Sequence, residues 1–150
     1  MYFGRFDHSI DSKGRVSVPS QWRDRLLGDL RLVIAPFTVS GQRCLDAYPF
    51  AEWEILLEKF AALPRFDSKA IKFQMGYLGR SHQCDIDQSG RILVPPQLRK
   101  HAGLLKDVVF VGVNTTFRLM EVGRFEKVVG EHDAEAALVR EDGIFDGLDL

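Results

Sequence analysis

The stretch DSKGRVSVPSQWRD at residues 11–24 recurs as DQSGRILVPPQLRK at residues 87–100. Aligned without gaps, the two stretches share Asp, Gly, Arg, Val, Pro, Gln and Arg at seven of fourteen positions. The likeness extends downstream, where LRLVIA at 30–35 corresponds to DVVFVG at 107–112, and RCLDAY at 43–48 corresponds to FRLMEV at 117–122. A repeat of this kind indicates two copies of one structural unit, because self-similarity reflects repeated architecture. Only two copies are present, which favours a pseudo-dimer within one chain over a solenoid.

Each copy predicts the same order of strands and helices. In the first copy, FDHSID and VSV alternate apolar and polar residues around the turn SKGR, which predicts a hairpin of two short strands. Pro19 cannot donate to a sheet but suits the first turn of a helix, here the helix in SQWRDRLL. LRLVIA and RCLDAY then predict two further strands, so the unit is β-β-α-β-β.

The segment between the copies predicts two helices. PFAEWEILLEKFAAL places Phe50, Trp53, Leu57 and Phe60 at spacings of three and four, which is typical of an amphipathic helix. DSKAIKFQMGYLG predicts a second helix with Asp67 or Ser68 as its N-cap. The apolar stripe around Trp53 either packs on the protein's own core or forms a subunit interface, and the sequence leaves both open.

We therefore predict an α+β fold, mainly β, in which two β-β-α-β-β repeats interleave into one small closed barrel with peripheral helices. Strands this short do not form a stable sheet alone, and closure removes exposed strand edges. The expected segments are a first repeat at 5–52, connecting helices at 53–80, a second repeat at 81–127, and a helix end with an acidic tail at 128–150.

Charge is distributed unevenly along the 150 residues. The net charge is −1, but residues 131–150 carry seven acidic side chains against one basic, whereas residues 1–130 carry nineteen basic against fourteen acidic. The body of the protein is thus basic and its tail acidic, which permits a nucleic-acid partner. We expect a cytoplasmic protein without a membrane span. Cys44 and Cys84 are isolated in sequence, so we expect buried free thiols and no metal site.

The repeated motif Asp-x-x-Gly-Arg falls at the tip of the predicted hairpin in both copies. Glycine supplies a positive-φ turn position, aspartate accepts hydrogen bonds from turn amides, and an arginine on a rigid turn suits phosphate or guanine. The candidate DNA-binding residues are Lys13, Gly14, Arg15, Ser89, Gly90 and Arg91, with Asp11 and Asp87 as loop-orienting residues. The alternative is that each Asp–Arg pair is a salt bridge that merely fixes its turn. The helix positions of Arg23 and Arg99 favour exposed surface arginines.

Catalytic motifs are missing from the sequence. It contains no Walker motif, GxGxxG, HExxH or GxSxG, and the four histidines do not recur at equivalent positions in the two copies. We therefore expect a protein that is not an enzyme and that needs no cofactor, metal or small-molecule substrate.

The opening FGRFDHSIDSKGRVSVPSQWR and its repeat CDIDQSGRILVPPQLR resemble the bacterial MraZ family of transcriptional regulators, which is related to AbrB-like swapped-hairpin DNA-binding domains. The resemblance covers nearly the whole chain. It implies a swapped-hairpin, AbrB-like barrel made from both halves of one chain. It also implies a homo-oligomeric ring, associated with the nucleoid, that binds spaced, G-rich promoter repeats upstream of its own division and cell-wall gene cluster and represses that cluster. The DNA-contacting motifs then fall on residues 11–15 and 87–91.

Two other classes of function stay open from the residues alone. An antitoxin-like protein-interaction module would use the barrel as a platform without specific DNA binding, and a small barrel enzyme would need a catalytic site that the sequence does not signal. Retention of the protein on promoter DNA would distinguish the DNA-binding regulator from both of these alternatives.

Overall fold

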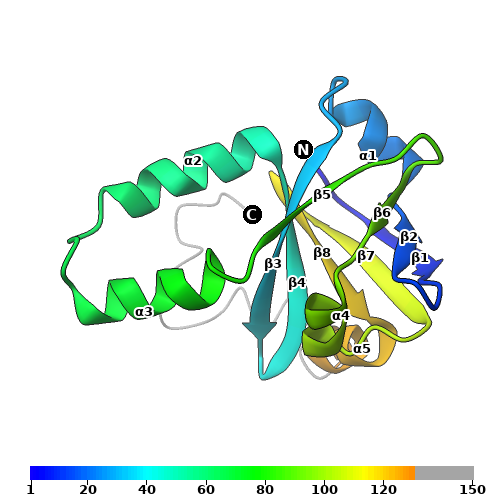
Figure 1. The fold of residues 1–150 in the computed structure, drawn as a ribbon. Coiled ribbons are helices and arrows are strands. Elements are labelled where there is room, and N and C mark those ends of the chain that lie inside the picture. The colour runs from blue at the N-terminus through cyan, green and yellow to red at the C-terminus, as the bar shows by residue number, and fades with distance from the viewer. Residues whose placement is uncertain (131–150) are drawn as a thin grey trace, which may run out of the picture.

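The computed structural model describes residues 1–130, and within them the two copies have the same succession of elements (Figure 1). The first copy comprises β1 (Arg5–Ser9), β2 (Arg15–Ser17), α1 (Ser20–Arg25), β3 (Arg31–Val39) and β4 (Gln42–Pro49). The second comprises β5 (His82–Asp85), β6 (Arg91–Leu93), α4 (Pro96–Ala102), β7 (Asp107–Val113) and β8 (Thr116–Glu121). The copies are connected by α2 (Phe50–Ala61) and α3 (Ser68–Tyr77), and α5 (Val122–Gly130) follows β8. The predicted α+β fold, mainly β, is confirmed, and the predicted acidic tail at 131–150 lies outside the described residues.

Strands of the two copies are interleaved. β1 pairs with β7 and β5 pairs with β3, so the first strand of each copy joins the third strand of the other. This exchange produces one antiparallel sheet of six strands in the order β1-β7-β8-β4-β3-β5. β2 and β6 pair with each other in a separate two-stranded ribbon. The predicted interleaving of the two repeats is therefore confirmed.

The predicted hairpin in each copy forms its turn but not its strand pairing. The amide of Asp11 donates to the carbonyl of Arg15 over 3.0 Å, which closes the turn. Outside the turn, β1 pairs with β7 and β2 pairs with β6. The three-residue β2 would offer β1 fewer backbone hydrogen bonds than the seven-residue β7 does. Full closure was also wrong in detail. β1 and β5 are the edges of the six-stranded sheet, and the β2–β6 ribbon packs across that sheet instead of joining it. We call the sheet and the ribbon together the barrel, although it is not fully closed.

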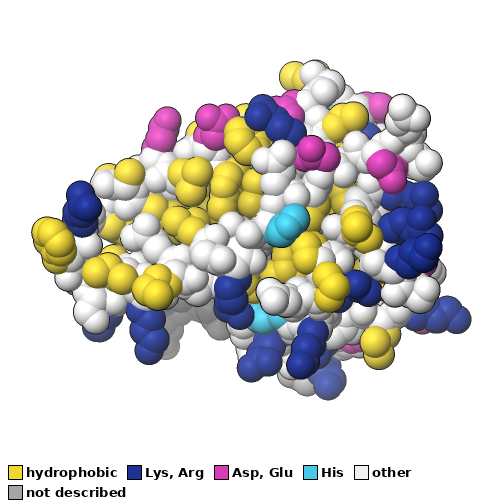
Figure 2. All heavy atoms as spheres, viewed as in Figure 1, with side chains coloured by type: hydrophobic (Ala, Val, Ile, Leu, Met, Phe, Trp, Pro, Cys, Tyr) yellow, Lys and Arg dark blue, Asp and Glu magenta, His cyan; other side chains and the backbone are white. Residues whose placement is uncertain are grey.

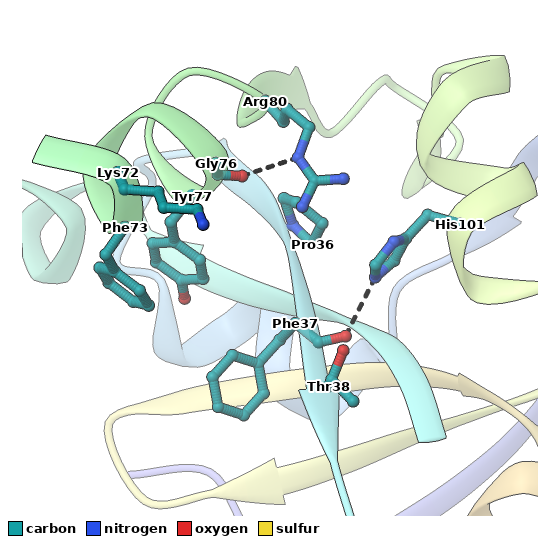
Figure 3. Close-up of a pocket in the computed structure, with 9 residues that line it drawn as sticks. All are labelled: Pro36, Phe37, Thr38, Lys72, Phe73, Gly76, Tyr77, Arg80 and His101. Carbon is teal, nitrogen blue, oxygen red and sulfur yellow. Dashed lines mark hydrogen bonds between the residues drawn. The ribbon is translucent and has the colours of Figure 1, made fainter. Parts of the chain in front are cut away.

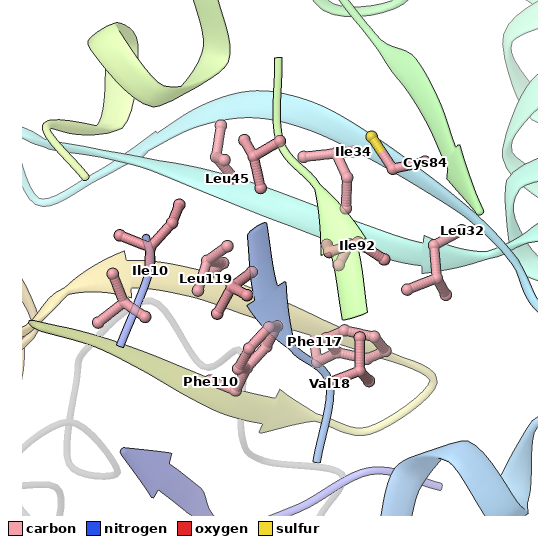
Figure 4. Close-up of a cluster of buried hydrophobic side chains, with 14 of the residues drawn as sticks. Ile10, Val18, Leu32, Ile34, Leu45, Cys84, Ile92, Phe110, Phe117 and Leu119 are labelled. Atoms are coloured by element: carbon pink, nitrogen blue, oxygen red, sulfur yellow. The ribbon is translucent and has the colours of Figure 1, made fainter. Parts of the chain in front are cut away.

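The main hydrophobic core lies between the ribbon and the sheet, and it draws on both copies (Figure 4). Figure 4 shows Val18 and Ile92 among side chains that come from β3, β4, β7 and β8. The Trp22 ring of the first copy lies 4.8 Å from Phe117 and 6.1 Å from Phe110 of the second, measured between ring centroids. The apolar residues that follow the turn in each copy are all buried, namely Val16, Val18, Ile92 and Val94. Since each copy lines the other's core, neither has a complete core alone.

Each copy expressed alone is therefore expected to stay unfolded as a monomer. Residues 1–50 would expose Trp22 and the unpaired edges of β1 and β3, and residues 81–130 would expose Phe110 and Phe117. Thermal unfolding followed by circular dichroism, with the mass measured by sedimentation, tests this. The full chain serves as the control, and a monomeric half that unfolds cooperatively would contradict the shared core.

Helices α2 and α3 form a helical arm that projects from the barrel (Figure 1). The predicted apolar stripe on α2 was wrong at one position. Trp53 is 7% exposed and packs against the barrel with Leu56, whereas Leu57 is 39% exposed. Asp67 caps α3 by accepting from the amide of Ala70 over 2.9 Å, as expected. No helix within residues 1–130 has the length and apolar character that crossing a membrane requires.

A buried polar network attaches the helical arm to the barrel. The Asp46 carboxylate accepts from the Tyr77 hydroxyl over 2.6 Å and from Arg118 Nε over 2.8 Å, and the Tyr48 and Tyr77 hydroxyl oxygens are 2.6 Å apart. Burial, together with the charge of Asp46, holds the pKa of Tyr77 far above its usual value. Tyr77 is thus a permanent donor, and the charge of Asp46 is balanced by Arg118.

Candidate nucleic-acid interface

The β2–β6 ribbon brings the two repeated motifs together on one surface. In its register Arg15 faces Leu93, Val16 faces Ile92 and Ser17 faces Arg91. Val16 and Ile92 are each 1% exposed and point into the core. Alternation along the strands therefore directs their neighbours away from the core, because successive side chains leave opposite faces of a sheet. We call this outward surface the ribbon face, and it consists of Arg15, Ser17, Arg91 and Leu93.

Basic side chains gather around the ribbon. Figure 2 shows Lys and Arg concentrated at the edge of the molecule where Figure 1 places β2 and β6. Arg15 and Arg91 stand diagonally across the ribbon, since each lies two residues along its strand from the partner of the other. Two arginines that are far apart in sequence thus lie close together on the ribbon face.

In the first loop, Asp11 organises both the turn and the arginine. Its Oδ1 atom accepts from the amides of Lys13, over 3.0 Å, and Arg15, over 2.8 Å. Its Oδ2 atom accepts from Arg15 Nε over 2.8 Å. Hydrogen bonds from Arg15 and Lys13 lower the pKa of Asp11 to about 2, so the carboxylate stays charged at all physiological pH values.

The salt bridge considered as an alternative is thus present in the first loop. It involves only the Nε atom of Arg15, and no described residue accepts from the terminal amino groups of that guanidinium. Orientation by Asp11 and contact with a ligand are therefore compatible. An arginine held through Nε presents its two terminal nitrogens in a fixed direction, which is the arrangement that bidentate recognition needs.

The second loop has the same turn but holds its arginine less firmly. Asp87 Oδ1 accepts from the amides of Ser89 over 2.8 Å and Arg91 over 3.0 Å. Arg91 Nε, however, lies 3.9 Å from Asp87 Oδ2, and this buried nitrogen has no hydrogen-bond partner among the described residues. The backbone bond from Arg91, followed by the Ser89 bond and the Arg91 and Arg15 charges, lowers the pKa of Asp87. The two loops therefore have similar backbones, but the second holds its arginine side chain less firmly than the first.

Both loop glycines are required for two reasons. Gly14 has a φ of +93° and Gly90 a φ of +79°, in the left-handed region that favours glycine. A side chain at Gly14 would also collide, because its Cβ would lie 2.6 Å from Arg99 Nε and 2.7 Å from the Val94 carbonyl oxygen. A Cβ at Gly90 would likewise run into the guanidinium of Arg23. The glycines therefore permit both the turn and the close approach of an arginine from the other copy.

Arg23 and Arg99 are not the exposed surface arginines that their helix positions predicted. Both are only partly exposed, and each packs beneath the loop of the opposite copy. Arg99 Nε donates to the Val94 carbonyl over 3.0 Å, and its Nη1 donates to the Ser12 carbonyl over 3.3 Å. Arg23 lies against Gly90, but its buried Nε has no partner among the described residues. The signal for this role was present in the sequence, since both arginines belong to the seven repeated identities.

The cysteines are placed for neither a disulfide nor a metal site in the part of the chain that the structure describes. Cys44 and Cys84 are buried free thiols, as predicted, and burial raises the pKa of Cys44 to about 11 and that of Cys84 to about 12. Both thiols are therefore neutral and unreactive. Among residues 1–130, no group of three or more His, Cys, Asp and Glu side chains is placed to hold a metal ion.

Comparison with known proteins gives a consistent result. Residues 1–75 and 77–142 match the family model of the MraZ protein, whose description compares that protein with antitoxins. The chain is 36% identical over 148 residues to a transcriptional regulator MraZ of Pediococcus pentosaceus, which covers 99% of this chain and all of that protein. It is 40% identical over 126 residues to the protein of the same name from Lachnoclostridium phytofermentans, with 84% and 85% coverage. The transcriptional regulator MraZ of Acidithiobacillus ferrooxidans is 38% identical over 130 residues, with 84% and 86% coverage.

Proposed function

As this chain belongs to the MraZ family, we propose that it is a transcriptional regulator that reads promoter DNA with the ribbon face. The observation that carries the proposal is the register of the ribbon, which sets Arg15 and Arg91 on one outward surface above a core of Val16 and Ile92. Its relatives are named transcriptional regulators, and a regulator of this kind needs no catalytic group.

The dimensions of the ribbon suit the major groove of DNA. Two strands of three residues make a patch about 10 Å long at ~3.3 Å per residue, and a two-stranded ribbon fits a groove about 12 Å wide. Arginine is the side chain that most often pairs with the O6 and N7 atoms of guanine. The G-rich repeats implied by the family resemblance are thus the bases that Arg15 and Arg91 would select, while Lys13 and the Ser89 hydroxyl would contact phosphate. The amides of Gly14, Ser89 and Gly90 already donate within their own turns, so the two glycines would contribute by letting the loop backbone approach DNA closely.

The contacts available to one subunit are too few for specific binding alone, and this supports an oligomer. Two loops offer only a handful of contacts, and non-specific binding of that strength has a Kd of about 10⁻⁴ to 10⁻⁶ M. Several subunits in a ring, each on one of a series of spaced promoter repeats, would raise the avidity by roughly 10² to 10⁴. We propose such a ring, nucleoid-associated in the cytoplasm, that represses its own division and cell-wall gene cluster.

The subunit interface considered for the apolar stripe of Trp53, Leu57 and Phe60 needs revision. Trp53 and Phe60 pack against their own subunit, which leaves Leu57 as the exposed member of the three. The helical arm also presents other exposed apolar residues, and we propose that these contact the next subunit together with Leu57: Ile55, Leu63, Phe66, Ile71 and Met75. The repeats at 5–52 and 81–127 would then act as one DNA-reading unit, with residues 53–80 as the connecting arm and 128–150 outside that unit.

Retention on promoter DNA tests the proposed function. The full chain is expected to bind DNA from upstream of its own gene about 10³-fold or more tightly than a scrambled duplex of equal length at the same salt concentration. A gel-shift titration with both duplexes measures the ratio. A ratio near one would reject sequence-specific binding and favour the antitoxin-like interaction module, which needs no operator.

A further inference from the structure

A second surface of the protein has the features of a small-molecule site. It is a cavity of about 390 Å³ between α3, β3 and α4 (Figure 3). That volume lies within the range of about 300 to 1,000 Å³ that is usual for ligand pockets. The ribbon face does not contribute to it, so the DNA-binding proposal leaves this cavity without a role.

Among the described residues, the cavity is lined by two cationic side chains, Lys72 and Arg80, by His101 and by no carboxylate. Lys72 comes from α3, Arg80 follows that helix, and His101 comes from α4 on the other side of β3 (Figure 3). The nearby negative charge of Asp46 is already paired with Arg118. A site with this balance attracts an anion, because a positively lined concavity raises the local concentration of negative ligands.

Two of these basic groups are held in position by the backbone. Arg80 Nε donates to the Gly76 carbonyl over 2.7 Å, and its terminal amino groups have no acceptor among the described residues. His101 Nε2 lies 3.0 Å from the Phe37 carbonyl oxygen, and since a carbonyl only accepts, Nε2 carries the proton. With the proton on Nε2, the His101 Nδ1 atom carries a lone pair and accepts a hydrogen bond from a ligand. The fixed guanidinium of Arg80 presents donors to a phosphate with little loss of side-chain entropy, and the fixed imidazole presents an acceptor to a hydroxyl group of the same ligand.

The cavity also offers aromatic surface. The rings of Phe73 and Tyr77 are stacked, with centroids 5.3 Å apart and an interplanar angle of 17°, and Phe37 meets Tyr77 edge-on at 6.3 Å. Phe73 is 49% exposed, so part of its ring is open to a planar partner. Stacking of one more ring on such a face is favourable. The anion that this pocket suits therefore carries a planar aromatic group.

We propose that this cavity binds a nucleoside phosphate, with the phosphate on Arg80 and Lys72, the base against Phe73 and a sugar hydroxyl donating to His101 Nδ1. Nucleoside mono- and diphosphates combine a planar base with a compact anion, which matches both halves of the lining.

The pocket is connected to the DNA-reading loops through α4. This helix, Pro96–Ala102, carries His101 at the cavity and Arg99 beneath the first loop, where Arg99 donates to the Ser12 and Val94 carbonyls. A nucleotide whose sugar hydroxyl donates to His101 would secure α4 against β3 and keep Arg99 under the loop. Bound nucleotide is therefore expected to raise the affinity for promoter DNA about 5-fold or more, within the usual range of coupling between sites. This coupling rests on the proposed DNA-binding function, whereas nucleotide binding itself does not.

Titration calorimetry of the full chain with ADP tests the binding. ADP is expected to bind saturably, and both adenosine and inorganic phosphate at least about 10-fold more weakly, because each engages one half of the lining. Arg80→Gln and, separately, Lys72→Gln are expected to weaken ADP binding about 10-fold or more. Lys72 has no hydrogen bond to a described residue, so its replacement leaves the fold intact even if Arg80→Gln disturbs the end of α3. Lys69→Gln, on α3 but outside the cavity, is the matched control.

Several results would overturn the site. No binding at about 1 mM ADP would do so, as would equal affinities for ADP and inorganic phosphate, or affinities unchanged by both cavity variants. Loss of ADP binding in the Arg15→Ala, Arg91→Ala double variant would place the nucleotide on the ribbon face instead. A change of mass in solution caused by Lys72→Gln, without ADP binding by the unaltered chain, would make the cavity a subunit contact.

The DNA experiment is separate. If ADP binds and promoter affinity is the same with and without it, the coupling through α4 is wrong. If the chain binds ADP but no promoter DNA, the proposed function fails while the nucleotide site stands.

Discussion

Replacing Arg15 and Arg91 together with alanine is expected to abolish specific promoter binding while leaving the melting temperature nearly unchanged. One well-placed bidentate arginine contributes about 1–3 kcal/mol of base discrimination, so the pair should change specific affinity by roughly 10- to 10⁴-fold. Both side chains are partly exposed and lie on the ribbon face, where their removal leaves the core residues Val16 and Ile92 undisturbed. Gel shifts on specific and scrambled duplexes, with thermal unfolding of the same preparations, measure both quantities.

The single variants should be unequal. Arg15 is fixed by Asp11 and has Lys13 beside it, whereas Arg91 Nε lies 3.9 Å from its carboxylate and Ser89 occupies the place of the lysine. Arg15→Ala is therefore expected to cost more affinity than Arg91→Ala. Arg65→Ala, at an exposed position between α2 and α3, is the matched control and should bind like the unaltered chain. Equal losses in the two loops would contradict the asymmetry, and a marked fall in melting temperature would assign the arginines to folding.

The second large effect concerns operator geometry. Reducing the promoter repeats to one is expected to weaken binding by roughly 10² to 10⁴, because the later contacts of a ring are intramolecular. Moving two repeats apart by half a helical turn, about 5 base pairs, should have a similar effect, since successive ribbon faces would then meet opposite sides of the duplex.

A displacement by a whole turn, about 10 base pairs, is the control for spacing and should restore part of the affinity. The measurement is Kd against repeat number and spacing at one salt concentration, with the mass of the protein determined in the same buffer. Substituting Phe66 and Met75 with serine should reduce both the mass and the dependence on repeat number, because these residues are exposed on the helical arm. Tight binding of a monomer to one isolated repeat would contradict the proposed ring.

Much of the fold followed from the repeat, and the deviations have physical causes. Local alternation predicted the strands correctly but gave no information on their partners, because the apolar face of β1 serves equally well in a hairpin or beside β7. The stripe on α2 was misassigned at Leu57 because residues three and four apart are both neighbours on a helix, and only the crossing over the barrel selects Leu56.

The candidate site was anticipated in its residues and not in its arrangement. The motif fixed the turns at Gly14 and Gly90, since both require positive φ. That Arg15 and Arg91 would share one face depends on β2 pairing with β6, a contact between residues far apart in sequence that no local pattern encodes. The hydrogen bonds of Arg99 beneath the first loop were not predicted. Helical periodicity indicates which residues face outward from a helix, but not which loop packs against them.

Pairing of β1 with β7 has a consequence for the protein during its synthesis. Arg5–Ser9 leaves the ribosome long before its partner Asp107–Val113, which lies about one hundred residues later in the chain. At translation rates of about 5–20 residues per second, the nascent first half waits on the order of 5 to 20 s with an unpaired edge and with Trp22 lacking the rings of Phe110 and Phe117. During that interval the first halves of neighbouring nascent chains can supply each other's missing strands, since the two repeats are alike. Slowing the ribosome between the repeats is therefore expected to raise the yield of intertwined chains, and a chaperone that shields strand edges is expected to lower it.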